Sequence, residues 1–485
     1  MADGRTIARN SAFLGLAFAI SKFFSIGLTV IAGRVLGASG FGLYATGAAL
    51  VEVGRIVGGA GLDYLVAREV ASAPERADRV ARHAAALKLA AGVVIYVALL
   101  GIVVWMDYPR PVLGVVLIVG TALFLENLSD TLDAVFQGVE RMHVTTVAFA
   151  TSAAFVFVSG AAALLGGLGV LGYAACFAAG FVVRFAVMLR AATRDGLVSV
   201  RVRGLERAES LRQLRAAVPL LGATVLAVVF HRMDLLMLGR MESPEQVGLY
   251  AAAVRIVDVV VLLPRILATA VYPALRKQLD VDARRLGAMV ADATRVSLVL
   301  CSLAGLAVWF LAPVALRWIP GPEFVPATDA LRLLSWGIVL QGGAHMIARL
   351  LLAIEAERDF ALVAGVSLLV NLALNLVWIP RLGIEGAALA TLTAYGANLA
   401  LYFVVAAHRG RRVPLGRSVV GPLGAVVAAY GVTVWTRDGG LGIQVAAVAA
   451  TWVIALVVLR GVRGLDLDRI RKLARRDAEG AFGGE

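Results

Sequence analysis

The chain has 485 residues, of which 60% are hydrophobic and only 16% are charged, whereas soluble domains are typically about 45–50% apolar and about 25% charged. This composition excludes a single water-soluble core and indicates that the lipid bilayer is the solvent for most of the chain. The formal net charge of +13 would favour nucleic-acid binding only if the basic residues formed a patch on a soluble surface.

A membrane-spanning helix needs about 20 apolar residues to cross a hydrocarbon core of about 30 Å. Fourteen segments meet this requirement, in chain order 11–33, 41–66, 83–105, 111–135, 144–165, 168–189, 216–238, 247–273, 289–312, 327–354, 360–379, 384–406, 418–435 and 441–459. Their uniform apolarity favours helices over the alternating strands of a membrane barrel. The first segment follows a short basic lead, as a signal peptide would, but it is 23 residues long and reappears in paired form in the second half. We therefore predict an all-α polytopic membrane protein of about 14 transmembrane helices that keeps this first helix.

The basic residues are concentrated in alternate connectors. With the N-terminus in the cytoplasm, the cytoplasmic connectors and termini hold 30 of the 46 Lys and Arg residues, and the external connectors hold 6. This bias follows the positive-inside rule, so the net charge reflects membrane topology and nucleic acid is not an expected partner. We predict a multi-pass protein of the cell (inner or plasma) membrane with both termini in the cytoplasm.

Two connectors repeat each other along the chain. Residues 33–45 ("GRVLGASGFGLYA") and 239–251 ("GRMESPEQVGLYA") share six of thirteen residues at an offset of 206. They join the first expected helix to the second and the seventh to the eighth, so helices 1–6 and 7–12 form two copies of one unit, related by an axis along the membrane normal. The glycines of the first copy are expected to allow a tight turn, with Arg34 and Tyr44 at the outer membrane interface.

The expected domains follow from this repeat. They are an N-terminal lobe at 1–195, a basic cytoplasmic linker at 196–215, a C-terminal lobe at 216–408, and helices 13 and 14 with a basic cytoplasmic tail at 409–485. The whole connector 190–215 carries seven arginines. The favoured interpretation is a solvated segment held against anionic lipid, and docking to a partner is the alternative.

Eight charged residues lie deep in expected helices 1, 2, 7 and 8, the four helices that the repeated connectors join. They are Lys22, Glu52, Arg55, Arg232, Asp234, Arg255, Asp258 and Arg265. A charge at the bilayer centre costs about 2.5–3.5 kcal/mol on insertion scales, so we predict that all eight face one hydrated, substrate-binding cavity between the lobes. The five bases and three acids leave two excess positive charges, which suits an anionic headgroup.

Pairing within one helix is the alternative for part of this set. Two pairs have the i,i+3 spacing that permits it, Glu52 with Arg55 and Arg255 with Asp258. Lys22 and Arg265 have no acidic residue at helical spacing, so pairing within a helix does not account for them.

Other polar residues in the expected helices are interpreted as structural. Snorkelling to a nearby helix end accounts for Lys88, Arg184, Arg295, Arg332 and Arg349. Three acids of helix 4 either bind a coupling cation or pair with Lys88 or Arg184, and pairing is favoured; they are Glu126, Asp130 and Asp133. Interhelical hydrogen bonds between helices 11 and 12 are expected from Asn371, Asn375 and Asn398.

The sequence contains no recognisable motif for catalysis. It has no phosphate-cradling Gly-Lys-Ser/Thr loop, and neither a Ser-His-Asp set nor metal-ligand spacing is suggested. Its two cysteines, Cys176 and Cys301, lie in apolar runs and offer no disulfide framework. The external connectors, at most fourteen residues long, are too short for the external loop that glycan polymerases typically use. We expect a protein that is not an enzyme and has no cofactor, with a coupling cation, Na⁺ or H⁺, left open.

Three stretches resemble a known family. They are "LGASGFGLYA" (36–45), "MDLLMLGRMESPEQVGLYAAAVRI" (233–256) and "NLALNLVWIPRLGIEGAALATLTAYGANLALYF" (371–403). Over about residues 5–408 the chain is similar to the polysaccharide transporter (oligosaccharide flippase) family of the multidrug/oligosaccharidyl-lipid/polysaccharide exporter superfamily. The resemblance implies two six-helix lobes around a central cavity lined by helices 1, 2, 7 and 8, with alternating access. Asp234, Tyr44 and Tyr250 match motif positions of the family.

The resemblance also implies a cargo. A lipid-linked oligosaccharide on polyprenyl pyrophosphate would be flipped from the cytoplasmic to the outer leaflet for surface polysaccharide biosynthesis, with the headgroup in the cavity and the polyprenyl tail in lipid. Membrane lipids, a glycan polymerase and export machinery are the further partners expected. Two alternatives share the scaffold, a flippase for the peptidoglycan precursor lipid and a cation-coupled multidrug antiporter; the positive excess argues against the antiporter.

Overall fold

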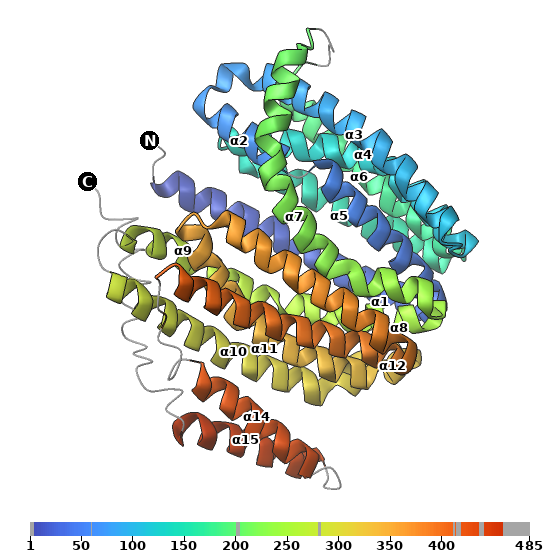
Figure 1. The fold of residues 1–485 in the computed structure, drawn as a ribbon. Coiled ribbons are helices and arrows are strands. Elements are labelled where there is room, and N and C mark those ends of the chain that lie inside the picture. Colours follow the sequence, from blue (N-terminus) through green and yellow to red (C-terminus); the bar gives the residue numbers. More distant parts are fainter. Residues whose placement is uncertain are drawn as a thin grey trace. The chain divides into compact units, whose positions relative to one another are not determined.

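The structure is a computed structural model that describes residues 4–59, 61–199, 204–279, 283–410, 413, 419–435 and 441–458. Within these ranges, the side chains of residues 4–22, 218–221, 223–224, 283–284, 357, 434–435 and 441–443 lie outside the described part. All regular secondary structure in the described residues is helical (Figure 1). The all-α class predicted from the sequence is therefore confirmed.

The helices agree with the expected spanning segments. In chain order they are α1 (Gly4–Gly59), α2 (Leu62–Ser72), α3 (Ala77–Trp105), α4 (Arg110–Gly138), α5 (Met142–Leu165), α6 (Gly169–Arg194), α7 (Arg207–Met241), α8 (Pro244–Val260), α9 (Leu262–Gln278), α10 (Ala283–Trp318), α11 (Thr328–Ala353), α12 (Glu357–His408), α14 (Val420–Trp435) and α15 (Leu441–Val458), with 3-10 helices at Pro74–Arg76 and Pro322–Ala327. Nine helices of the described chain are long and apolar enough to cross a membrane. The chain is a multi-pass membrane protein.

Glycine marks the turn inside two of the long helices. α1 consists of two helical arms joined by a kink at Gly37, which has φ 65° and ψ −178°. α12 has the same construction, with a kink at Gly383 at φ 56°. Each kink lies between two of the expected spanning segments. A positive φ strains residues with a Cβ atom, so the predicted role of the first connector's glycines is confirmed at Gly37.

The second helix of each repeat is interrupted, and the sequence predicts a kink only in the second copy, at Pro264. Expected segment 41–66 ends as α1 at Gly59 and resumes as α2 after Gly61, which has φ 89°. Expected segment 247–273 is divided between α8 and α9. The physical reason for this second break is Pro264. Its ring clashes with the carbonyl group four residues earlier, which belongs to Val260, the last residue of α8.

The described chain divides into two compact units. The N-terminal unit spans Met1–Ala251 and Arg317–Phe324, and the C-terminal unit spans Ala252–Leu316 and Val325–Arg475. This division follows packing, whereas the expected domains follow the internal repeat. The expected domain boundaries therefore stay a prediction.

Long apolar helices pack side by side in the N-terminal unit. The helices α3, α4, α5 and α6 form a layered group with the second arm of α1 (Figure 1). Two buried clusters lie between them, one around Val70 and Val135 and the other around Phe136 and Met188. This packing fixes the positions of the polar residues on α4, which the other helices surround.

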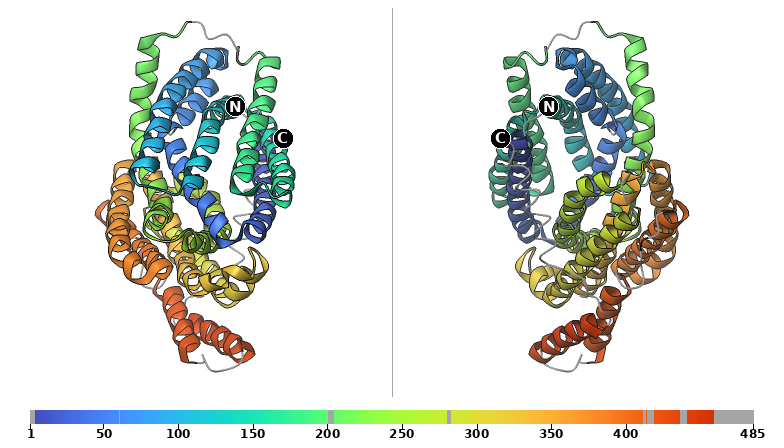
Figure 2. Two further views of the ribbon diagram at one scale, coloured as in Figure 1. Left: turned by 90° about the vertical axis from the view of Figure 1, so that its right-hand side faces the viewer. Right: turned by 90° about the vertical axis from the view of Figure 1, so that its left-hand side faces the viewer.

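The C-terminal unit has its own buried core. Leu275 of α9, Ile347 of α11 and Tyr402 of α12 belong to one cluster. The last two helices, α14 and α15, pack against each other as a pair (Figure 2). They also join the rest of the unit, because the Trp452 indole donates a hydrogen bond of 3.0 Å to Ser302 of α10.

The two copies of the repeated connector contact each other through the backbone of glycine residues, which have no side chain to keep the two segments apart. A Cβ atom placed on Gly248 would lie 1.8 Å from the carbonyl oxygen of Ala38, and one placed on Gly42 would lie 1.8 Å from the carbonyl oxygen of Pro244. Gly42 and Gly248 are equivalent at the offset of 206. Small residues allow this close approach of membrane helices, so the repeated motif is also a packing contact within the N-terminal unit.

The repeated tyrosines are buried, and the expected place of Tyr44 at the membrane interface stays a prediction. Tyr44 is 5% exposed and its ring lies 4.5 Å from the ring of Tyr173. Tyr250 is 1% exposed. Arg34 donates a hydrogen bond of 2.6 Å to the carbonyl of Trp318. The aromatic rings therefore pack within the N-terminal unit.

The connector that follows α6 is bound to protein in its described parts. Arg212 donates two hydrogen bonds, of 2.8 and 2.9 Å, to the carboxylate of Glu69 in α2. The backbone amide of Ser199 donates to Asp78 at 2.6 Å, and the backbone amide of Glu206 donates to the His83 imidazole at 3.0 Å. Arg212 is still half exposed, so these contacts bind the connector to α2 and α3 without removing it from water, and its expected position against anionic lipid stays a prediction.

Candidate functional site

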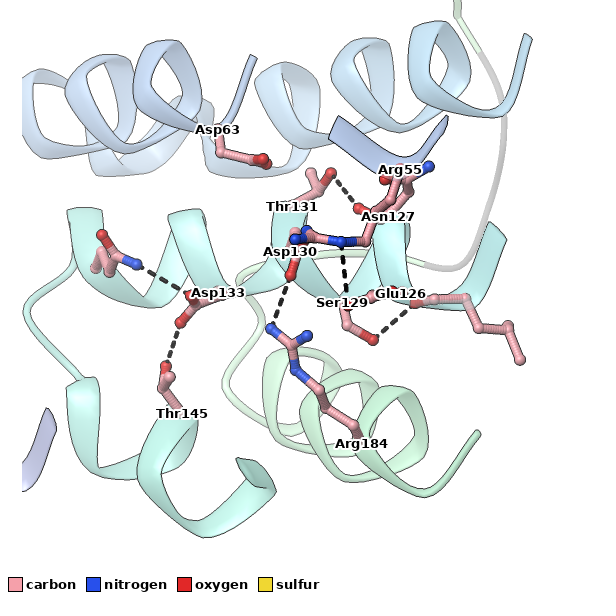
Figure 3. A network of polar contacts seen from close by, with 12 residues as sticks. Arg55, Asp63, Glu126, Asn127, Ser129, Asp130, Thr131, Asp133, Thr145 and Arg184 are labelled. Carbon is pink, nitrogen blue, oxygen red and sulfur yellow. Dashed lines mark hydrogen bonds and ion pairs between the residues drawn. The ribbon is translucent and has the colours of Figure 1, made fainter. Parts of the chain in front are cut away.

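A network of charges crosses the N-terminal unit at the second arm of α1, α4 and α6. Asp130 of α4 bridges two guanidinium groups: its Oδ2 lies 3.2 Å from Nη1 of Arg55, and its Oδ1 lies 2.8 Å from Nη2 of Arg184. Glu126, one helical turn earlier, lies 3.4 Å from Nε of Arg55. Figure 3 shows Arg184 reaching from α6 to Asp130. The two acids and two bases of this group balance in formal charge.

Arg184 is the most enclosed member of this network. It is 4% exposed, and its guanidinium carbon lies 4.0 Å from the centre of the Phe149 ring. The aromatic face and the carboxylate both stabilise the positive charge in a dry setting. Snorkelling therefore does not describe Arg184, whereas the alternative pairing of a helix 4 acid with Arg184 is confirmed.

A second ion pair lies beside α4. Lys88 of α3 has no exposed side-chain surface, and its ammonium group is paired with Asp63 of α2. It also donates a hydrogen bond of 3.2 Å to the carbonyl of Asn127. The pairing expected for Lys88 was with an acid of helix 4. Its partner is on α2 instead, because the break at Gly61 starts a new helix with Asp63 in its first turn.

The third acid of α4 is held by uncharged groups. Asp133 accepts hydrogen bonds from Thr145 at 2.7 Å and from Gln137 at 3.0 Å (Figure 3). No group of three or more His, Cys, Asp or Glu residues in the described part of the chain is arranged to hold a metal ion.

Glu52 pairs across helices. Its carboxylate lies 2.8 Å from Nε of Arg232 in α7 and accepts a hydrogen bond of 3.2 Å from Nη2 of the same guanidinium. The Glu52 side chain is 38% exposed and Arg232 is 17% exposed. Pairing of Glu52 with Arg55 inside one helix, one of the two alternatives from the sequence, is therefore not what the structure shows, since Arg55 faces α4.

Asp234 is enclosed. It is 6% exposed and accepts a hydrogen bond of 2.8 Å from the hydroxyl of Tyr250. Two of the three residues that match family motif positions thus bind each other, and this contact joins α7 to α8. The geometry assigns them a role in holding the helices together.

The basic residues of the C-terminal unit are arranged differently. Arg255 of α8 and Arg265 of α9 are both exposed, and neither forms an ion pair with another residue that the structure describes. Asp258 is partly buried. Lys22 lies in the first arm of α1, and its side chain is outside the described residues.

The structure therefore divides the eight predicted site residues. It brings Glu52 together with Arg232, gives Arg55 acidic partners on α4, and encloses Asp234. Sequence reasoning assigned no site role to Asp63, Lys88 or Arg184, and it gave Glu126 and Asp130 a coupling cation only as the less favoured alternative. A signal for these residues was available, because their charges are opposite in sign and lie at similar depth on different expected helices. Periodicity could not say which of those helices are neighbours.

This arrangement can bind and release charged groups, but it has no chemistry for bond cleavage. The enclosed pairs hold helices in place, and the exposed guanidinium groups can accept phosphate-like anions in a forked geometry. Together with the two-fold internal repeat and the broken helices, these features define a membrane transporter fold in which charged residues lie within the spanning helices.

Comparison with solved structures gives the same fold, that of membrane transporters. At 14% identity, the lipid II flippase MurJ in its inward closed conformation matches 93% of this chain and 99% of its own length, with a TM-score of 0.71. A multidrug resistance MATE family transporter of the MOP superfamily, in its inward-facing conformation, matches at 15% identity over 84% of this chain and 98% of its own length, with a TM-score of 0.69. These likenesses establish the fold.

The family follows from the sequence models. The chain belongs to the polysaccharide biosynthesis protein family, whose model matches residues 7–278, more than half of the chain. A second model, MatE, matches residues 219–377. The predicted membership of the polysaccharide transporter family is confirmed.

One curated relative carries a functional name. The chain is 25% identical over 171 residues to the probable low-salt glycan biosynthesis flippase Agl15 of Haloferax volcanii. The match spans 35% of this chain and 36% of that relative, so about a third of the relative's length is covered. These relatives and fold neighbours are named as flippases and transporters, which agrees with the prediction that this chain is not an enzyme.

Proposed function

We propose that this protein is a flippase that moves a lipid-linked oligosaccharide, carried on polyprenyl pyrophosphate, from the cytoplasmic to the outer leaflet. The observation that carries the proposal is the pair of exposed guanidinium groups, Arg255 and Arg265, in helices apolar enough to span a membrane. Cations placed in an apolar wall without acidic partners favour an anionic guest, because the field is strong where water is sparse.

The glycan part of the proposal rests on the relatives. The family is named for polysaccharide biosynthesis, and the Haloferax relative is named as a glycan biosynthesis flippase. A lipid-linked sugar is both an anionic guest and a glycan precursor. Its pyrophosphate carries the negative charge, and its polyprenyl chain is soluble in the bilayer. Membrane lipids, a glycan polymerase and export machinery are the partners that such a cargo implies.

The mechanism that fits this fold is alternating access. The interrupted second helix of each repeat, at Gly59–Gly61 and at Val260–Val261, supplies the kind of discontinuity at which transporter helices change shape. The termini would lie in the cytoplasm, where the basic connectors also lie. A cation, Na⁺ or H⁺, is the proposed coupling agent.

Two other cargoes use a similar scaffold. The peptidoglycan precursor lipid is also a polyprenyl pyrophosphate, so it would bind the same guanidinium groups and differ in its sugar. A cationic drug would not be attracted by Arg255 and Arg265.

The test is export of a surface glycan in cells that depend on this protein. Charge-neutralising variants Lys22→Gln, Arg255→Gln and Arg265→Gln are expected to block export while the amount of protein in the membrane stays the same. Normal export in all three variants would contradict the assignment of these side chains to the cargo.

The control is a basic residue outside the predicted site. Arg332 lies near the N-terminal end of α11 and is paired with Asp329 at 3.2 Å. Arg332→Gln should leave export unchanged. Uptake of a cationic dye by vesicles separates the antiporter from the flippase, because only the antiporter would move it.

A further inference from the structure

The start of α7 is docked onto α2 and α3 within the N-terminal unit (Figure 1). Glu206, the residue directly before this helix, and Gln213, in its second turn, both contact α3. The contact includes His83 of α3, a histidine with no exposed surface. Neither the sequence pattern nor the proposed function gives His83 a role.

Both ring nitrogens of His83 are bound to backbone groups whose hydrogen-bonding roles are fixed. Nδ1 lies 2.8 Å from the carbonyl oxygen of Arg79, one turn earlier on α3. A carbonyl can only accept, so Nδ1 carries the proton. Nε2 accepts a hydrogen bond of 3.0 Å from the backbone amide of Glu206. An amide N–H can only donate, so Nε2 is bare, and the two partners together assign a neutral imidazole.

The other contacts that join the start of α7 to α3 are weaker. The Glu206 carboxylate lies 2.8 Å from Nη2 of Arg79, but both side chains are more than half exposed, and exposed ion pairs contribute little. Gln213 donates a hydrogen bond of 3.4 Å to the carbonyl of Val80. The enclosed hydrogen bond from Glu206 to His83 is therefore the contact on which this docking depends most.

Protonation of His83 would turn its Nε2 from an acceptor into a donor. The new N–H would face the amide N–H of Glu206, and both donors would lose their partner at an enclosed site. An unsatisfied buried donor changes an equilibrium by about ten- to a hundredfold. The same proton that charges the ring would therefore push the connector away from α3.

The charged groups around the ring do not offer the new proton a free acceptor. Each carboxylate at this contact already has an arginine partner: Asp78 has Arg82, Glu206 has Arg79, and Glu209 and Glu69 share Arg212. The acids of α1 and α4, which also pack against α3, are engaged in the ion pairs and hydrogen bonds described above. A charged imidazole would have to compete with an arginine for any of the carboxylates at the contact.

We infer that His83 is a pH-sensitive latch, which holds the start of α7 on α3 while its imidazole is neutral and releases it when the imidazole is protonated. Imidazole is the side chain that changes its charge between pH 5 and pH 8, so docking is present at the upper end of this range and is lost as the pH falls. The signal is acidification on the side of the membrane where the connector lies. The released turn belongs to the helix that carries Arg232 and Asp234. The latch goes beyond the proposed function, because it concerns control and is the same for any cargo.

The experiment measures the distance between α2 and the start of α7 in the full-length protein in lipid nanodiscs. Spin labels are attached at Ala71→Cys and Ala208→Cys, two exposed positions, in a chain that also carries Cys176→Ala and Cys301→Ala. Pulsed electron paramagnetic resonance should give one narrow distance at pH 8. At pH 5 a second, longer distance should appear, with the ratio of docked to released protein lowered about ten- to a hundredfold.

Variants at the contact assign the response. His83→Gln is neutral at every pH and should give the same distances at pH 8 and pH 5, whereas His83→Arg is always charged and should be released at both. His143→Gln removes an exposed histidine of α5 in the same unit and is the matched control, which should respond as the wild type does. Glu206→Gln keeps the amide and removes the carboxylate, so it should also respond. Thermal unfolding of each variant in the nanodisc establishes that it is folded.

The outcomes are decisive for the latch. Distances that stay the same between pH 8 and pH 5 in the wild type would overturn it. A pH response that survives in His83→Gln would assign the response to another group, and one that disappears in Glu206→Gln would assign it to the carboxylate in place of the amide; either result contradicts the inference. Failure of the latch leaves the flippase standing, because glycan export tests the flippase separately.

Discussion

The two units differ in how some of the arginines and lysines inside their spanning helices are paired. In the N-terminal unit, Arg55 and Arg184 share Asp130, and Lys88 is paired with Asp63 with no exposed surface of its own. In the C-terminal unit, Arg265 and Arg349 lie on helices whose acids are absent or engaged elsewhere.

The comparison teaches which charges hold the fold and which are available to a ligand. A buried ion pair loses much of its favourable energy if one partner is removed, because the remaining charge is left unpaired. A cation that lacks a protein partner contributes little to folding, so its presence in a spanning helix points to binding. Stability and transport are therefore expected to respond to different arginines.

The largest effect is expected from Arg184→Ala. It leaves Asp130 with one counter-ion fewer in an enclosed setting and should lower the free energy of unfolding by about 3–5 kcal/mol. Arg349→Ala should change it by about 1 kcal/mol or less, as is usual for substitutions without such a feature. Thermal unfolding in detergent measures both. Equal losses of unfolding free energy in the two variants would contradict the proposed difference between the units.

A double-mutant cycle on Lys88 and Asp63 tests the same point within the N-terminal unit. Lys88→Met alone strands the carboxylate of Asp63, and adding Asp63→Asn should restore part of the lost stability. The expected coupling energy is about 0.5–3 kcal/mol. Additive losses would mean that the pair in the structure does not contribute to folding.

Arg232→Gln and Arg265→Gln allow the unfolding temperature and glycan export to be compared for a paired and an unpaired arginine. Arg232 is paired with Glu52 at 2.8 Å, so its loss should lower both the unfolding temperature and glycan export. Arg265 forms no ion pair within the described residues, so its loss should lower export alone. Export and the unfolding temperature are measured on the same membrane preparations. A fall in the unfolding temperature of Arg265→Gln equal to that of Arg232→Gln would contradict the division.

The smallest effect on the free energy of unfolding is expected from the solvent-exposed charges of the connector after α6, where Arg212 binds Glu69 of α2. Hydrogen bonds from Arg212 lower the pKa of Glu209 below its usual 4.5. A lowered pKa in the folded state gives stability that is present above the unfolded value and is lost as the pH falls through the folded value. The contribution should be about 1 kcal/mol or less, and weaker at high salt, because Arg212 is half exposed.

Unfolding measured between pH 7 and pH 3 checks this prediction. Arg212→Gln should remove the part of the pH dependence that comes from Glu209. A pH dependence identical to that of the wild type would show that the contact does not stabilise the fold.

The sequence predicted the elements well because apolar length is a local property. Each of the fourteen expected segments falls on a described helix, and the turn at Gly37 follows from a glycine-rich connector. The break after α8 was also accessible, because Pro264 marks it. The break at Gly61 was missed, since a run of glycines within an apolar segment fits a spanning helix equally well.

The candidate site was only partly predictable. Depth along a helix can be read from the chain, and it singled out Glu52, Arg55 and Arg265. It could not tell that Arg55 faces Glu126 rather than Glu52, because both acids are close to it in depth and differ in the helix that carries them. Arg184 was assigned to snorkelling for the same reason, although Phe149 and Asp130 enclose it.

The sequence by itself determined the solvent, the helical class, the internal repeat and the family, because each depends on composition or on residues near one another in the chain. Tertiary structure decided the partner of each charge, since a charge pair is a contact between helices brought together by packing. It also gave the repeated "GLYA" motif its meaning, because the contact of Gly42 and Gly248 with the opposite backbone exists only when both copies are folded against each other.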